Sequence, residues 1–421
     1  MRVGIAAMGS RLGSGGGISV YTLRLVEALA DHGVGCDCVV LVSEDALPSW
    51  AHRQWPAHVK FVAIRQAETR QPFPARAYRR VRRLLGLVVP QSYGDAYVAR
   101  QIDGLDLDLI HYPRTVVHPL SILTPCVLTF FDIQHEYYPQ FFTESELEWR
   151  AQTYRASVEK AQHLIVPSRF TQRTLSEKFN VPECKMSYVP VGLPDSFRRT
   201  ASEQTEQIRI KYRLPHHFIF YPANPWQHKN HARLMAALRI LQDKYGDAPY
   251  LVLSGRLPHE RRDALSMAIA AGVEHLVIDL EFVPVEDLPA LYSAADLLVF
   301  PSLFEGFGIP LVEAMACGCP IAVSNATCIP ECANGSAFLF DPMDPTDMAA
   351  AIYTMLTDQA LRERLVSQGY EQLPRFDWRN ILPKLLQVYC DTATLQTTHI
   401  VRKHNSDALS LPEWPSYSRI R

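Results

Sequence analysis

The chain has 421 residues, of which 48% are hydrophobic and 20% are charged, and its formal net charge is −2. These are ordinary values for a globular protein, and the length predicts two or three domains that each bury a core. The near-neutral charge gives no general reason to expect nucleic-acid binding, and no apolar run approaches the roughly 20 residues that span a bilayer.

Cysteine usage and the first residues bear on the compartment. The nine cysteines are an odd number and are scattered along the chain, which fits a reducing compartment better than a disulfide framework. The start MRVGIAAMGS has a brief apolar run and then becomes glycine-rich, so it predicts a β-strand rather than a secretory signal. We therefore expect a cytoplasmic protein.

The first half of the chain alternates strands with helices. A strand at 2–7, the glycine-rich GSRLGSGGG and a helix at 18–32 form the opening of a Rossmann-like βαβ unit. The glycines do not give a clean G-x-G-x-x-G, so a dinucleotide site is only weakly supported. Further strands are expected at 38–42, 59–64, 109–112, 126–131, 163–166 and 186–191, with helices at 144–161 and from 169.

The second half repeats the alternation after a polar stretch at 198–207, which marks a linker. A new sheet begins at 218–221, and the loop PANPWQHKNH then opens a helix at 230–245. Strands at 250–254 and near 277 and 297, with helices near 261 and 288, continue an alternating βα pattern. Helices near 346 and 361 follow, and a terminal helix is expected at 380–391 before a polar tail.

Two metal-site patterns are weak. Asp106 and Asp108 form a D-x-D at the start of a strand, where turn punctuation explains them better and no further cluster of oxygen ligands accompanies them. The spacing of four nearby cysteines is not that of a usual structural zinc site; they are Cys317, Cys319, Cys328 and Cys332. We expect no metal.

The most informative stretch is AADLLVFPSLFEGFGIPLVEAMACG at 294–318. Its apolar run 297–300 predicts a buried parallel strand, and the helix between Pro310 and Gly318 is apolar on every side except for Glu313. We expect Glu313 in the first helical turn, where a buried carboxylate needs a partner such as a sugar or ribose hydroxyl. The alternative is a solvated glutamate at a helix start.

Glu305 and Glu313, with seven residues between them and GFGIPLVEAMACG around them, resemble the Glu-x7-Glu motif of retaining GT-B glycosyltransferases, specifically glycosyltransferase family 4. The resemblance implies an α/β fold of two Rossmann-like parallel-sheet domains facing across a cleft. We expect an acceptor-side domain at 1–197, a linker at 198–214, a nucleotide-sugar domain at 215–377, and a terminal helix and tail at 378–421 that crosses back to the first domain.

The same resemblance assigns roles to other residues of the chain. It implies that Glu305 lies by the donor sugar and Glu313 binds the nucleotide ribose. Phe131 occupies the place of a histidine that contacts the donor in relatives, so Asp132 and His135 are the remaining polar candidates there. With Glu305, they are the catalytic candidates that the resemblance implies. The residues implied to bind the donor, in addition to Glu313, are Gly16, Asn224, Lys229, Arg256, Gly306, Phe307, Gly308 and Ile309. Among them, Asn224 stands where relatives have an arginine, and Arg256 is a candidate to replace it.

The resemblance implies a metal-independent hexosyltransferase of polysaccharide biosynthesis that needs no cofactor. Its donor would be a nucleoside diphosphate sugar, with GDP-mannose favoured by family frequency over UDP sugars, and its acceptor a glycan or a lipid-linked glycan. Three alternatives stay open: a nucleotide-sugar epimerase or hydrolase, a Rossmann oxidoreductase, and a binding protein without activity. The Arg-rich amphipathic helix expected at 76–88 predicts either a solvated or acceptor-binding basic face, which is favoured, or contact with the inner face of an anionic membrane.

Overall fold

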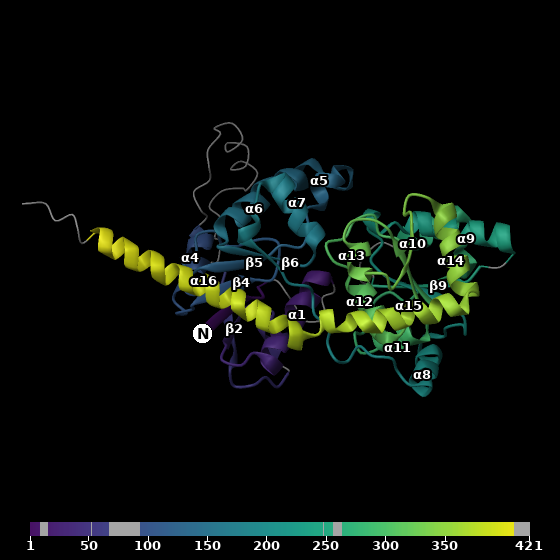
Figure 1. The fold of residues 1–421 in the computed structure, drawn as a ribbon, viewed down its shortest axis with the longest axis horizontal. Coiled ribbons are helices and arrows are strands. Elements are labelled where there is room, and N and C mark those ends of the chain that lie inside the picture. The colour runs from purple at the N-terminus through teal and green to yellow at the C-terminus, as the bar shows by residue number, and fades with distance from the viewer. Residues whose placement is uncertain (9–15, 52, 67–92, 247, 256–262, 408–421) are drawn as a thin grey trace, which may run out of the picture.

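The chain folds into two α/β lobes, each organised around one parallel sheet (Figure 1). The computed structural model describes residues 1–8, 16–51, 53–66, 93–246, 248–255 and 263–407. The two parallel-sheet domains expected from the sequence are therefore confirmed. We call the part built on the first sheet the first lobe, and the part built on the second sheet the second lobe.

The sheet of the first lobe has, within the described residues, the strand order β3-β2-β1-β4-β5-β6-β7. Its strands are β1 (Arg2–Ala6), β2 (Asp37–Ser43), β3 (Val59–Ile64), β4 (Leu109–Tyr112), β5 (Cys126–Thr129), β6 (His163–Val166) and β7 (Met186–Tyr188). The helices of this lobe are α1 (Gly17–His32), α2 (Leu47–Ala51), α4 (Tyr93–Asp103), α5 (Gln134–Tyr137), α6 (Glu144–Lys160) and α7 (Arg169–Phe179), with short 3₁₀ turns η1 (Pro139–Phe141) and η2 (Glu183–Lys185). Every residue of β4 and β5 is buried, as parallel strands covered on both faces require.

The sheet of the second lobe has the order β10-β9-β8-β11-β12-β13 over the described residues. Its strands are β8 (Phe218–Pro222), β9 (Tyr250–Ser254), β10 (Val277–Asp279), β11 (Leu297–Phe300), β12 (Ile321–Ser324) and β13 (Phe338–Phe340). Its helices are α8 (Ser202–Tyr212), α9 (His231–Tyr245), α10 (Asp263–Ala271), α11 (Leu288–Ala294), α12 (Ile309–Cys317), α13 (Ile329–Ala333), α14 (Pro345–Thr357) and α15 (Gln359–Gln372), with η3 (Gln227–Lys229), η4 (Glu274–Leu276) and η5 (Leu373–Phe376).

Several elements differ from the sequence expectations. The stretch expected to be a linker contains α8, which packs against α11. Only Ile208 of α8 is buried, so the helix has little apolar periodicity to reveal it. The short strands β12 and β13 were not expected, and the terminal helix α16 (Trp378–Asp407) continues well beyond residue 391, where we expected it to end.

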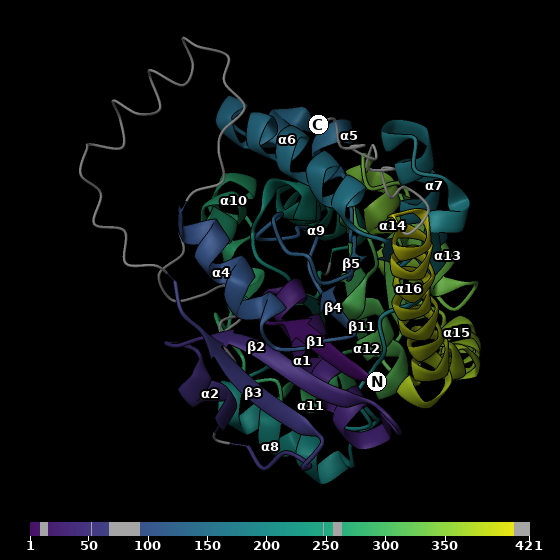
Figure 2. The same ribbon diagram turned by 90° about the vertical axis from the view of Figure 1, so that its left-hand side faces the viewer.

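The last helix returns to the first lobe. α16 contacts α1, β4 and β5, and it runs along the first lobe in Figure 1 and beside its sheet in Figure 2. The Tyr389 hydroxyl lies 2.6 Å from Nδ1 of the buried His111 in β4, which ties α16 to the sheet. Where the chain crosses between the lobes, the Leu193 N–H donates to the Phe376 carbonyl at 2.8 Å. Two crossing segments therefore join the lobes and are bonded to each other.

Candidate active site at the junction of the lobes

A lysine–glutamate pair lies at the carboxyl end of the second sheet. Because β8 and β11 are neighbours in this sheet, the loops that follow them emerge side by side. Lys229 comes from the loop after β8 and Glu305 from the loop after β11, and Lys229 Nζ lies 2.6 Å from Glu305 Oε1. The Tyr221 hydroxyl donates to the Lys229 carbonyl at 2.8 Å and holds the first loop. The structure thus brings two of the predicted donor-site residues together and pairs their charges.

Asp132 follows β5 in the first lobe and lies within electrostatic range of this pair. Burial raises the pKa of Asp132, and the nearby Glu305 carboxylate adds to the rise. The backbone N–H of Gln134 donates to Asp132 Oδ1 at 3.0 Å and lowers the same pKa, as do the cations of Arg150 and Lys229. One acidic group from the first lobe is therefore grouped with the Lys229–Glu305 pair of the second.

His135, the other catalytic candidate of the first lobe, is only 4% exposed in α5. Its ring stands edge-on to Tyr154, with the ring centroids 5.1 Å apart. Burial, followed by Arg150 and Arg155, lowers the pKa of His135 to about 4, so the imidazole is uncharged at neutral pH. Within the described residues neither of its ring nitrogens has a hydrogen-bond partner.

Arg150 and His228 belong to the same region and were missed by the sequence analysis. The Arg150 guanidinium lies 4.4 Å from the centroid of Phe142 and donates to the Tyr154 hydroxyl at 2.7 Å. Burial is the main cause that lowers the pKa of His228 to about 4, and the cations of Lys229 and Arg150 lower it further. Arg150 is one of two arginines on the polar helix α6, and no sequence pattern singles it out.

Gly306 is a point of close contact between the two lobes. Its carbonyl accepts a hydrogen bond of 2.8 Å from the Ser168 hydroxyl of the first lobe. A Cβ atom at residue 306 would stand 2.1 Å from the carbonyl oxygen of Phe131, so only glycine permits this approach. The ring of Phe131 stands edge-on to Tyr21, with the centroids 5.1 Å apart.

The other residues of the predicted donor loop lie between Gly306 and α12. Phe307 is buried, and its ring contacts Phe376 with the centroids 5.9 Å apart. Gly308 has a φ of +142° and is the N-cap of α12, and Ile309 is the first residue of that helix. The helix α12 therefore begins at the carboxyl edge of the sheet, close to Glu305 in sequence.

Three further residues were predicted to bind the donor. Gly16 is the exposed N-cap of α1, with a φ of +101°. Asn224 lies in the loop after β8, and its Oδ1 has no hydrogen-bond partner among the described residues. Arg256 lies outside the described residues, as does the basic segment 76–88.

Glu313 is buried on α12, but it is the fifth residue of the helix, so the expectation of a first-turn position was wrong. The glycine loop is one residue shorter on its carboxyl side than we expected, because the helix already begins at Ile309. Arg24 of α1, in the first lobe, donates from Nη2 to Glu313 Oε1. Tyr292 of α11 donates to Oε2 at 2.7 Å. The partner that a buried carboxylate requires is thus supplied by the protein.

A second glutamate joins the lobes at α13. Glu331 accepts hydrogen bonds from the backbone N–H groups of Arg169 at 2.7 Å and Phe170 at 3.0 Å. These groups are at the start of α7, where unpaired N–H groups and the helix dipole favour an anion. The carboxylate of the second lobe therefore caps a helix of the first.

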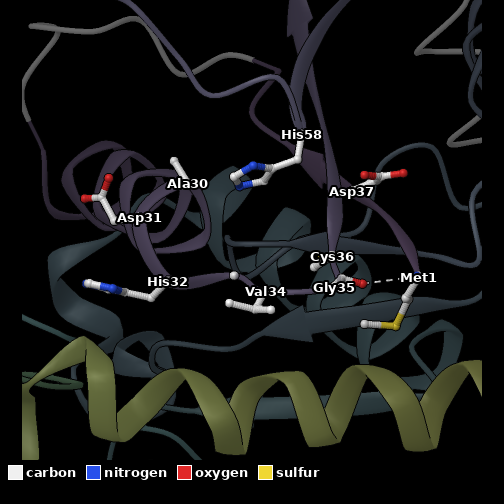
Figure 3. A pocket seen from close by; sticks show the side chains of 10 residues that line it. Met1, Ala30, Asp31, His32, Val34, Gly35, Cys36, Asp37 and His58 are labelled. Atoms are coloured by element: carbon white, nitrogen blue, oxygen red, sulfur yellow. Dashed lines mark hydrogen bonds between the residues drawn. The ribbon is translucent and has the colours of Figure 1, made fainter.

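A pocket of about 400 Å³ lies elsewhere, at the amino ends of β1 and β2. Asp31, His32, Asp37 and His58 are among its lining residues, and α16 passes below Val34 in the close view (Figure 3). Ligands of open α/β sheets bind at the carboxyl ends of the strands, so this pocket is not the candidate active site.

The described residues contain neither a metal-binding cluster nor a helix that could span a membrane. In the described part of the chain, no three His, Cys, Asp or Glu side chains are grouped as a metal site would require. Asp108 instead accepts a hydrogen bond of 2.6 Å from the Arg2 N–H, and Asp106 has a φ of +53° as in a turn. None of the helices found over the described residues is long and apolar enough to cross a bilayer.

Comparison with known sequences gives a consistent picture. The model of the family described as Glycosyltransferase Family 4 matches residues 15–197, and the model described as Glycosyl transferases group 1 matches residues 204–372. The O-antigen chain mannosyltransferase B of Escherichia coli is 29% identical over 269 residues, which are 63% of this chain and 70% of that protein. The serotype-specific mannosyltransferase WbdA of the same species is 29% identical over 53% of this chain, but the match spans only 28% of WbdA.

Solved structures agree on the fold. Sucrose-phosphate synthase from Thermosynechococcus elongatus has a TM-score of 0.71 at 19% identity, covering 93% of this chain and 98% of that one. HepE of Anabaena, in complex with UDP-glucose, has a TM-score of 0.69 at 18% identity, covering 93% of this chain and 100% of that one. Together, the two matched family models and the two-sheet architecture show that the chain belongs to glycosyltransferase family 4 and is a glycosyltransferase enzyme with the GT-B fold.

Proposed function

We propose that the enzyme transfers a hexose, with mannose the first candidate, from a nucleoside diphosphate sugar to a glycan or a lipid-linked glycan, with retention of anomeric configuration. The names of two relatives, both mannosyltransferases, support the sugar, and the UDP-glucose complex of HepE supports the class of donor. The nucleotide sugar would bind the second lobe and the acceptor the first.

The observation that carries this proposal is the Lys229–Glu305 pair beside Asp132. When the bond between sugar and phosphate breaks, negative charge builds up on the diphosphate and positive charge at the anomeric carbon. Lys229, whose Nζ lies 2.6 Å from Glu305 Oε1, is placed to stabilise the diphosphate of a bound donor. Glu305 would then be released to hold the donor sugar, and its negative charge faces the developing positive charge.

The loop that follows Glu305 would complete the donor site. Gly306, Phe307, Gly308 and Ile309 lead into α12, whose start favours an anion such as the diphosphate. Asn224, with an amide oxygen that has no partner among the described residues, would bind the donor from the loop after β8. The protein itself would thus supply the charge stabilisation that a metal ion supplies in other transferases.

Two first-lobe residues would complete the chemistry. Asp132 lies beside the pair and would orient the sugar or the acceptor hydroxyl. His135, neutral at physiological pH and without a hydrogen-bond partner among the described residues, would accept or donate one hydrogen bond to the donor sugar. Retention would follow from attack on the face that the leaving group vacates, with the departing phosphate oxygen taking the proton of the acceptor.

The test begins with the full-length protein and its nucleotide. GDP and UDP are compared by thermal shift, since a ligand that binds only the folded protein raises its melting temperature. GDP-mannose and UDP-glucose are then incubated with glycan acceptors, and NMR of the product gives the anomeric configuration. A product with inverted configuration, or a sugar consumed without an acceptor, contradicts the proposal. Consumption without an acceptor would instead support an epimerase or a hydrolase.

An oxidoreductase and a binding protein without activity are tested separately. An oxidoreductase, which the family assignment does not support, would change the absorbance of a nicotinamide cofactor. A binding protein would retain nucleotide without turnover. For contact of the basic segment 76–88 with a membrane, flotation with anionic vesicles at low salt is the direct assay, and absence of flotation favours the solvated or acceptor-binding face.

A further inference from the structure

Arg24 is a buried cation that the proposed chemistry does not use. It belongs to α1 of the first lobe, its side chain is 3% exposed, and it pairs with Glu313 on α12 of the second lobe, 289 residues away in sequence. The Tyr292 hydroxyl donates to the other carboxylate oxygen at 2.7 Å. Burial raises the pKa of Tyr292, and the Glu313 carboxylate raises it further, so Tyr292 remains a hydrogen-bond donor.

A buried ion pair is a poor way to gain stability. Removing two charges from water costs several kcal/mol for each ion, and apolar replacements of similar volume are often at least as stable. What such a pair does supply is a fixed geometry, because the charges tolerate few alternative arrangements. The Arg24–Glu313 pair therefore fixes the direction of the Glu313 carboxylate more than it strengthens the fold.

The carboxylate keeps hydrogen-bonding capacity in this arrangement. Each carboxylate has about four lone-pair sites on two oxygens, and Arg24 and Tyr292 occupy one site on each oxygen. The remaining site on each oxygen matches a pair of neighbouring hydroxyl groups, such as the 2′ and 3′ hydroxyls of a ribose. α12 begins at the donor loop, which places Glu313 about one helical turn from the proposed diphosphate site.

Arg24 is also fixed from the side of the chain crossing. Its guanidinium carbon lies 5.1 Å from the centroid of Phe197, and the ring of Phe197 lies 6.4 Å from that of Tyr292. Phe197 follows the crossing segment that contains Leu193, where the lobes are already bonded together. The pair is thus close to the connection between the lobes.

We propose that Arg24 is a positioning residue of the first lobe that aims the Glu313 carboxylate at the ribose hydroxyls of the donor nucleotide. The inference rests on the proposed function and on the ribose-binding role that the family resemblance implies for Glu313. It adds that recognition of the nucleotide, although located in the second lobe, depends on a side chain of the first. Arg24 itself does not touch the donor.

The test compares nucleotides with and without ribose hydroxyls. Calorimetry measures the affinity for GDP and UDP and for their 2′,3′-dideoxy forms, in the wild type and in Arg24→Met, Arg24→Lys, Glu313→Gln and the double variant Arg24→Met/Glu313→Gln. The quantity of interest is the ratio between the affinity for a nucleotide with its ribose hydroxyls and the affinity for the dideoxy form of the same nucleotide. Loss of hydrogen bonds to a charged group predicts a wild-type ratio of roughly 10 to 100.

Arg24→Met and Glu313→Gln are each expected to bring this ratio close to one. The double variant is expected to have the same ratio as Glu313→Gln alone, because both substitutions act through the same carboxylate. Arg24→Lys is expected to restore part of the ratio, because it keeps a cation near the carboxylate. In turnover assays, Arg24→Met should raise the KM for the donor more than it lowers kcat. Arg53→Met is the matched control. Arg53 is an exposed arginine outside α1 that pairs with Glu27 of α1, so its removal also breaks an ion pair of that helix.

The outcomes separate the two proposals. If the wild type binds neither GDP nor UDP, the proposed function fails. If it binds them and prefers the ribose forms, but folded Arg24→Met keeps that preference, the role of Arg24 is wrong while the function stands. If Arg24→Met does not fold, the double variant, in which the buried charge is also removed, and Arg24→Lys still decide the question.

Discussion

The ring of Phe304, in the second lobe, packs against Tyr137 of the first lobe, with the ring centroids 5.3 Å apart. Phe170 and Tyr138 also contact it, at 5.7 and 6.1 Å between centroids. Phe304 is only 2% exposed, and it immediately precedes Glu305. An aromatic anchor therefore holds the proposed donor loop against the first lobe.

Phe304→Ala should destabilise the protein by about 3–5 kcal/mol, the usual cost of removing a buried phenylalanine ring. The three ring contacts that it loses all lie between the lobes, so the lobes should separate more readily. Thermal unfolding of the full-length protein measures the effect. Phe282→Ala removes a ring that is 40% exposed and should shift the melting temperature far less. Equal shifts in the two variants would show that Phe304 is not an anchor.

Gly306→Ala should cost about 1–3 kcal/mol and lower turnover, because the new methyl group meets a backbone oxygen of Phe131 that has little freedom to move. Gly17→Ala is the matched control for stability, since nothing lies within 4 Å of a Cβ atom built there. Denaturation midpoints compare the two variants. A Gly306→Ala protein as stable as the wild type would mean that the lobes do not close as described.

Glu305→Gln should lower kcat by about 10²- to 10³-fold, the range seen when one electrostatic contact to a transition state is removed. Affinity for the nucleoside diphosphate alone should change little, because in the proposed role Glu305 contacts the sugar. Steady-state kinetics and calorimetry give the two quantities. Glu363→Gln, an exposed side chain on α15, serves as the control. Equal losses of turnover and nucleotide affinity would contradict the assigned role.

The buried imidazole of His111 should make the protein less stable in acid. Burial lowers its pKa from 6.5 to about 3, so below pH 6.5 the unfolded chain takes up a proton that the folded protein does not. The contribution of the neutral His111 to the free energy of unfolding is complete above pH 6.5. It is lost as the pH falls toward 3, at about 1.4 kcal/mol per pH unit.

His111→Gln tests this dependence on pH. The variant keeps groups able to bond with Tyr389 and Thr129, but it has no titrating ring. The difference in unfolding free energy between the wild type and the variant should therefore shrink, or change sign, between pH 6.5 and 4. A difference that stays constant over this range would be inconsistent with a neutral buried imidazole.

Sequence patterns identified the sheets well, because parallel strands covered on both faces leave continuous apolar runs. Val59–Ile64, Leu109–Tyr112 and Leu297–Phe300 begin and end where we expected. β13 has only three residues, and α8 has one buried side chain, so neither leaves a periodic signal. The pattern also placed Glu305 and Lys229 after strands, but not the neighbouring positions of β8 and β11 that bring them together.

The identity of the partner of Glu313 could not be predicted from composition or from the spacing of residues. The apolar surroundings of Glu313 correctly indicated that its carboxylate is buried and needs a partner. Arg24 lies on an amphipathic helix, where an arginine is ordinarily solvated, and nothing local distinguishes it from Arg2 or Arg53. Only the contact of α1 with the second lobe reveals the pair, and that contact depends on the arrangement of the whole chain.

The return of α16 to the first lobe bears on the order of events during synthesis. His111 and the sheet around it obtain the hydroxyl of Tyr389, together with the buried Leu385 beside it, from a helix encoded 278 residues later. When the first 200 residues have left the ribosome, the helix α16 that covers part of the first lobe has therefore not yet been translated. Chaperone capture of stalled nascent chains should then persist until codons beyond Tyr389 have been read, rather than ending when the first sheet has emerged.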